Sequence, residues 1–162
     1  MISLPDLILL DEHGGDWNKY LGVLYQFFCS DFIKNKTMYN GRKLGLKKYP
    51  KLNGKEATFW HIISEGKYED QKIPEMRRCE RIRWPKVIIE NNNDTSIKVW
   101  KNNRGNETNI CLCYGNWEYI VILRERPKYT LFWTAYPLKY SHTKRKMKKE
   151  YEKFIKKANI AV

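Results

Sequence analysis

The strongest constraint on the fold is a set of short apolar stretches with a two-residue period, which begins near residue 86. Side chains alternate between the two faces of a strand, so this period predicts β-strands. The connections are short and rich in turn residues, and Gly115-Asn116 favours a tight hairpin. Strands joined in this way pair antiparallel, since a parallel crossover needs a longer connection. We expect a meander of four or five strands, at residues 87–89, 97–100, 110–114, 118–123 and 129–136.

The segments on either side of this sheet have the three- to four-residue period of helices. Asp16 is a suitable N-cap for a first helix that runs to about Asn35. A last helix is expected at about 143–158, with an apolar stripe on one face and lysines on the other. The basic segment 40–50 is typical of an exposed loop with at most one short strand. The predicted fold class is α+β, with N-terminal helices, an antiparallel sheet and a C-terminal basic amphipathic helix.

The length of 162 residues fits a single domain covering the whole chain. Within it we expect a helical and basic loop region to about residue 53, and a core from about residue 54 onward. A hydrophobic content of 42%, with six tryptophans, is too high for a disordered chain. No apolar run approaches the ~20 residues that span a bilayer, and Asp6 interrupts a start that lacks basic residues. We therefore expect a cytoplasmic protein with no membrane partner.

The positive charge of the chain is concentrated in two segments. Residues 36–55 contain seven Lys and Arg and no acidic residue, and residues 141–157 contain eight basic and two acidic residues. Together these segments account for the whole formal net charge of +13. Such concentration favours binding to a polyanion, because neutralised phosphates release their counterions. The alternative is that these lysines only keep the surface soluble.

Cysteine and histidine are too few and too scattered to indicate a metal centre. The four cysteines include no Cys-x-x-Cys pair, and only three histidines are present. Cys111 and Cys113 point to one side of a predicted strand, where buried free cysteines are the more common explanation. We expect no metal, no cofactor and no disulfide. Gly-rich phosphate loops, nucleophile elbows and metal-binding His-Glu-x-x-His helices are also missing from the sequence.

Three segments nevertheless carry residues suited to chemistry. In segment 54–66, His61 lies between an aromatic residue and two isoleucines, where either a catalytic or a structural role is open. The last expected strand ends in two hydroxyl groups, Thr134 and Tyr136, on one face, with Trp133 on the other face. Tyr136 is able to stack on a base or donate to a phosphate, and Thr134 is able to donate to a phosphate.

The third segment, 76–85, is rich in arginine. If it is extended, Arg78 and Glu80 share one face, and Arg81 and Arg83 share the other. Guanidinium groups at the start of a sheet are suited to bidentate phosphate contacts. Ion pairs with nearby glutamates are the alternative explanation.

These segments contain three blocks, in order along the chain, that resemble a known family. The blocks are Phe-Trp-His-Ile-Ile-Ser-Glu-Gly at 59–66, Arg-Cys-Glu-Arg-Ile-Arg-Trp at 78–84 and Trp-Thr-Ala-Tyr-Pro at 133–137. They look like the phage-encoded nucleases of the barnase–EndoU–colicin–RelE superfamily, and the resemblance covers roughly residues 54–150. It implies N-terminal helices before a four-stranded antiparallel sheet. It also implies a metal-independent ribonuclease, of phage, prophage or toxin type.

The same resemblance implies roles for individual residues. Attack of a ribose 2′-OH on the adjacent phosphate needs a base, an acid and cations for the developing charge. His61 is then the general acid or base, and Glu80 is a second candidate base. Arg81 stabilises the pentavalent phosphorane, with Arg83 as its substitute.

Further residues are implied or predicted to contact the substrate. Thr134 hydrogen-bonds a phosphate oxygen, and Tyr136 positions the nucleotide. The expected partner is RNA, whether tRNA, mRNA or ribosome-associated RNA, with a cognate antitoxin or immunity protein as a possible second partner. Contacts to the nucleic acid are predicted for Arg42, Lys43, Lys47, Lys48, Lys55, Arg78, Lys144, Arg145 and Lys148.

Two other functions remain open from the sequence. One is a non-catalytic nucleic-acid-binding module in which His61 is merely packed. The other is a phage-encoded inhibitor of a host protein, whose basic segments meet an acidic groove. Steep salt dependence separates phosphate binding from protein contact.

Overall fold

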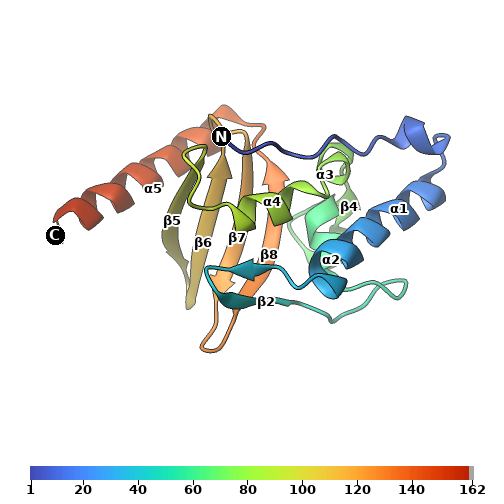
Figure 1. Ribbon diagram of the computed structural model, residues 1–162, viewed down its shortest axis with the longest axis horizontal. Coiled ribbons are helices and arrows are strands. Elements are labelled where there is room, and N and C mark those ends of the chain that lie inside the picture. Colours follow the sequence, from blue (N-terminus) through green and yellow to red (C-terminus); the bar gives the residue numbers. More distant parts are fainter. Residues whose placement is uncertain (161–162) are drawn as a thin grey trace.

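The computed structural model describes residues 1–160 and has an α+β architecture (Figure 1). Its α-helices are α1 (Trp17–Cys29), α2 (Ala57–Ile63), α3 (Met76–Glu80), α4 (Trp84–Glu90) and α5 (Ser141–Ile160). Its strands are β1 (Met38–Tyr39), β2 (Arg42–Leu46), β3 (Ser64–Glu65), β4 (Ile73–Pro74), β5 (Ile97–Arg104), β6 (Glu107–Tyr114), β7 (Tyr119–Glu125) and β8 (Thr130–Pro137). Shorter helical turns are η1 (Leu10–His13), the π-helical η2 (Ser30–Lys34) and η3 (Glu69–Gln71).

The main sheet has six strands in the order β1-β2-β8-β7-β6-β5. Strands β5 to β8 form the expected antiparallel meander, which confirms that part of the prediction. The sheet as a whole is mixed, because β2 pairs parallel with β8. The prediction of a purely antiparallel sheet is therefore wrong at this edge. The two strands are far apart in the sequence, and α2, α3, α4 and the meander form the connection that parallel pairing requires.

The segment 76–90 forms α3, a turn at 81–83 and α4, so the strand expected at 87–89 is wrong and the extended conformation considered for 76–85 is not the one adopted. Glu75 caps α3, since its carboxylate accepts a hydrogen bond of 2.8 Å from the backbone N–H of Arg78. Pro85 lies in the first turn of α4, where a backbone N–H is not needed. A short apolar run fits a buried strand and a buried helix equally well, and here the helix packs into the core.

The two long helices form as the sequence predicts. The Asp16 carboxylate accepts hydrogen bonds from the N–H groups of Asn18 and Lys19, and the helical path continues through η2. α5 is slightly longer at both ends than expected. None of the helices within residues 1–160 has the length and apolar character needed to cross a membrane.

The sheet separates two apolar clusters. The larger cluster lies between one face of the sheet and helices α1, α2 and α4. The smaller one lies on the opposite face, where Met147 of α5 packs near Trp100 and Trp117. Figure 1 shows that α5 runs beside β5 and continues past the edge of the sheet. Since α5 covers only that side, the part of this face that lies over β7 and β8 is left for the clefts described below.

The cysteines are free thiols, and three of them are buried. Cys111 and Cys113 both belong to the smaller apolar cluster, which confirms their prediction as buried free cysteines on one side of a strand. Burial raises the pKa of each of these two thiols to about 12.

Candidate functional site

A β-bulge in β8 determines which side chains meet at the candidate site. Ile122 pairs with Thr134, but Leu123 pairs with Phe132, so Trp133 is the extra residue. A bulge interrupts the strict alternation of side chains. Trp133 and Thr134 therefore line the same cleft, whereas Phe132 packs into the larger apolar cluster. The sequence-based expectation that Trp133 and Thr134 face opposite sides is wrong for this reason.

Beside the bulge lies a cleft with a volume of about 300 Å³, which we call the His61 cleft. It brings together four of the predicted site residues, which come from α2, α3 and β8. These four are His61, Arg78, Thr134 and Tyr136. The other residues of its lining are Ser64, Glu65, Gly66, Lys67, Lys72 and Trp133.

His61 is held in place by contacts of its ring and its backbone. Its side chain is buried, with 4% of the residue exposed, and its ring centroid lies 5.1 Å from that of Trp133. Its carbonyl oxygen accepts hydrogen bonds from Thr134 Oγ1 at 3.2 Å and from Arg78 Nη1 at 3.4 Å. Because β2 pairs with β8 only as far as Phe132, α2 is able to pack beside the remainder of that strand.

Arg78 presents a positive charge to the His61 cleft. Its guanidinium donates to the carbonyl of Ser64 at 2.5 Å and lies 4.9 Å from the ring centroid of Tyr136. Among the side chains described, no carboxylate forms an ion pair with it, although Glu65 and Glu75 are near enough to favour its charge. Burial lowers the pKa of this guanidinium from its ordinary value, which marks a cation held away from water.

Arg124 is a second cation beside the bulge, and it was not predicted from the sequence. Its guanidinium lies 3.6 Å from the ring centroid of Trp133, and its Nε donates to Asn109 Oδ1 at 3.2 Å. Burial lowers the pKa of Arg124 as well. One feature of the sequence could have indicated Arg124. It shares one face of an apolar strand with Ile120 and Ile122, where a charged residue is unexpected.

Arg124 lines a further cleft of about 300 Å³, which we call the sheet-face cleft. This cleft shares Trp133, Thr134 and Tyr136 with the His61 cleft, so the two are continuous over β8. Its far side is formed by β5 and α5, where Arg104 and Glu150 lie 3.9 Å apart.

The structure places the other predicted catalytic residues outside these clefts. Arg81 lies over the ring of Trp84 at 5.0 Å and pairs with Glu80 at 3.6 Å. Arg83 lies over the ring of Phe27 at 4.8 Å, on the side of α1. The physical reason is the helical conformation of α3, after which Arg81 and Arg83 fall in the turn that leads to α4. Glu80, Arg81 and Arg83 are thus not brought together with His61.

The predicted nucleic-acid contacts are also distributed unevenly. Lys47 reaches the site, with its Nζ 5.6 Å from the ring centroid of Trp133. Lys55 lies over the ring of Tyr25, and Arg42 donates to two backbone carbonyls in the turn between β7 and β8. The remaining predicted contacts are exposed or half-buried, and they are Lys43, Lys48, Lys144, Arg145 and Lys148.

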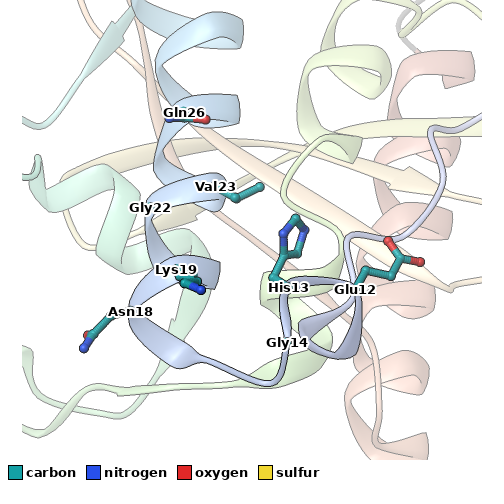
Figure 2. Close-up of a pocket in the computed structure, with 8 residues that line it drawn as sticks. All are labelled: Glu12, His13, Gly14, Asn18, Lys19, Gly22, Val23 and Gln26. Atoms are coloured by element: carbon teal, nitrogen blue, oxygen red, sulfur yellow. The ribbon is translucent and has the colours of Figure 1, made fainter.

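A separate hollow of about 520 Å³ lies where η1 meets α1. Its lining includes His13, but Figure 2 shows Glu12 and Asn18 pointing away to opposite sides. The polar groups there do not converge on a common point, so we do not regard this hollow as a functional site.

The chemistry available beside the bulge is that of anion binding and proton transfer. The half-buried guanidinium of Arg78 and the imidazole of His61 line the His61 cleft, and the half-buried guanidinium of Arg124 lies over the ring of Trp133 in the adjoining sheet-face cleft. Among the side chains that the structure describes, no three of His, Cys, Asp or Glu are grouped as metal ligands would be. Comparison of the chain with protein-family models, with curated proteins and with solved structures finds no match.

Proposed function

We propose that the protein is a ribonuclease that cleaves RNA without a metal ion, with its active centre in the His61 cleft. The observation that carries this proposal is that His61 and Arg78 line one cleft with Trp133, while Arg124 lies over the ring of Trp133 in the adjoining cleft. Arginine is suited to phosphate because its planar guanidinium donates in a bidentate manner. Burial lowers the pKa of both arginines, and shifted pKa values in a cleft are typical of functional sites.

The proposed reaction is an intramolecular transfer at phosphorus. His61 takes the proton of the ribose 2′-OH, and the 2′-oxygen forms a bond to the adjacent phosphorus. The bond from phosphorus to the 5′-oxygen breaks, and that oxygen accepts a proton from a lysine of the cleft, Lys67 or Lys72. Arg78 and Arg124 stabilise the negative charge that develops on the phosphorane. The products are a 2′,3′-cyclic phosphate and a 5′-hydroxyl.

Thr134 and Tyr136 act in this scheme by positioning other groups. Thr134 Oγ1 donates to the carbonyl of His61, which ties the helix that carries the imidazole to β8. The ring of Tyr136 lies beneath the guanidinium of Arg78 and supports its orientation.

A specific observation favours one alternative function. The imidazole of His61 is almost wholly buried, as expected of a structural histidine in a module that binds RNA without cleaving it. Both functions use the two arginines, so only the fate of the RNA separates them.

The test is incubation of total RNA with purified protein in the presence of EDTA. We expect fragments with cyclic-phosphate ends from the wild type, and a loss of at least 100-fold in rate from His61→Ala and Arg78→Ala. Arg81→Ala and Arg83→Ala are matched controls, since these arginines lie outside the clefts, and we expect them to retain activity. Intact RNA that is still bound in an Arg78-dependent manner would favour the binding module. Activity that requires Arg81 but not Arg78 would contradict this assignment.

A further inference from the structure

A further cleft adjoins the proposed active centre. It has a volume of about 630 Å³, within the ~300–1,000 Å³ usual for ligand sites, and we call it the Trp60 cleft. One of its sides is a single face of α2 and the residue that follows. Ala57, Trp60, His61 and Ser64 recur there at the i, i+3, i+4 and i+7 positions of a helix. The opposite face of α2 packs into the larger apolar cluster.

The orientation of Trp60 in this cleft is fixed by two contacts. Its indole Nε1 donates to the carbonyl of Leu52 at 3.0 Å. Its ring packs edge-on against Phe59, with the centroids 5.4 Å apart. The indole is half-buried, so part of its ring remains open to the cleft. A planar ring that is already ordered binds another planar ring without losing further side-chain entropy.

The two remaining walls are also held by backbone hydrogen bonds. The loop wall contains Pro50 and Leu52, and Leu52 exchanges both backbone hydrogen bonds with Lys55. The other wall includes Pro74 of β4, which pairs with β3, and the next residue donates to the carbonyl of Ile63. The cleft is thus preformed and its surface is largely apolar. The polar residues of its lining are Lys51, Asn53, His61, Ser64, Asp70 and Lys72.

The Trp60 cleft is continuous with the His61 cleft. His61, Ser64 and Lys72 line both of them. A ligand that places a phosphate on Arg78 therefore has an aromatic, largely apolar chamber on the far side of His61. A nucleotide matches this arrangement, because it joins an anionic phosphate to a flat base through one sugar.

We propose that the Trp60 cleft is a nucleobase subsite, in which the base stacks on Trp60 while the attached phosphate lies on Arg78. This inference rests on the proposed function for the position of the phosphate. Stacking on aromatic side chains, with hydrogen bonds to the base edge, is how proteins recognise unpaired RNA bases. Asn53 and Asp70 supply the polar groups for that edge. The amide of Asn53 is able both to donate and to accept a hydrogen bond, and the carboxylate of Asp70 is able to accept one. Trp60 is thus a specificity-determining residue for the nucleotide next to the cleaved bond.

The experiment is calorimetric titration of the protein with the four nucleoside 3′-monophosphates and with ribose 5-phosphate, which carries no base. We expect wild type to bind at least one nucleotide about tenfold or more tightly than ribose phosphate. Trp60→Ala should remove that difference and leave the affinity for ribose phosphate unchanged. Trp60→Phe keeps an aromatic face and should keep most of the difference. Tyr68→Ala, at an exposed aromatic outside the cleft lining, is the control and should change neither affinity.

The outcomes separate this inference from the function on which it rests. If wild type binds nucleotides no more tightly than ribose phosphate, and Trp60→Ala behaves in the same way, the base subsite is wrong. Binding of both ligands that depends on Arg78 would still support the phosphate site. If neither ligand binds, or if Arg78→Ala binds both normally, the phosphate site is wrong and the subsite is overturned with it. A thermal unfolding midpoint for Trp60→Ala close to that of Trp60→Phe shows that both variants are folded.

Discussion

Two fully buried tyrosines differ in what their hydroxyl groups contact. Tyr20 Oη donates to the carbonyl of Ile8 at 2.6 Å, whereas Tyr119 Oη has no hydrogen-bond partner among the described residues. A buried polar group without a partner costs about 1–3 kcal/mol. We expect Tyr119→Phe to raise the free energy of unfolding by about 1 kcal/mol and Tyr20→Phe to lower it by a similar amount. Urea unfolding of both variants checks this, and a loss of stability in Tyr119→Phe would reveal a partner for that hydroxyl.

At the same scale, the candidate site was only partly predictable from the sequence. The residue types needed for phosphate chemistry led to His61 and Arg78, and the fold brings these together. The contact between Trp133 and Arg124 could not be predicted in this way, because it depends on the one-residue bulge in β8. Strict alternation assigns Trp133 to the wrong face, and nothing local to the sequence of β8 marks the extra residue.

At the scale of secondary-structure elements, Glu75 connects α3 to the segment before α5. Burial alone would raise the pKa of Glu75. Its carboxylate accepts hydrogen bonds from Lys139 Nζ and from the backbone N–H of Arg78, and both of these residues are positively charged. Together these contacts lower the pKa of Glu75 below its ordinary value of 4.5. The folded chain therefore binds this proton less readily than the unfolded chain. The stabilisation is fully present above pH 4.5 and is lost as the pH falls through the lower folded pKa.

We expect Glu75→Gln to be less stable than wild type at pH 7 and to converge with it under acid conditions. Lys139→Met should reduce the same acid dependence, because it removes the largest favourable partner of the carboxylate. Urea midpoints measured between pH 7 and pH 3 give the difference between each variant and wild type. Parallel curves for wild type and Glu75→Gln over that range would show that this contact contributes no pH dependence.

The same segment shows how far element prediction from sequence could reach. The apolar pattern repeats several times along α1, along α5 and along the strands of the meander. These elements could therefore be predicted from local residues. α4 is too short for that, and its buried Ile88 and Ile89 fit a strand until the core is known. The pairing of β2 with β8 is likewise determined by contacts between distant parts of the chain.

At the scale of the whole molecule, the two basic segments lie on opposite sides of the clefts. β2 and the loop after it flank β8 on one side, and Lys47 reaches Trp133 from there. α5 flanks β5 on the other side, and its Glu150 lines the sheet-face cleft. A strand of RNA that crosses the continuous clefts would therefore meet positive charge at both ends of its path. If the proposed function is correct, we expect the two basic segments to contact the same RNA strand.

This surface makes a specific prediction for the salt dependence of RNA binding. Each phosphate contact on a single strand contributes about −0.7 to the slope of log K against log salt. We expect Lys43→Gln/Lys48→Gln and Arg145→Gln/Lys148→Gln each to reduce the magnitude of the slope by about 1.4. Lys19→Gln/Lys34→Gln, which removes two exposed charges on and after α1, is the matched control and should leave the slope unchanged. If the slope changes for only one of the two double variants at the clefts, the RNA leaves the sheet face before it reaches the other basic segment. If the slope changes equally in all three double variants, binding is not directed to this face.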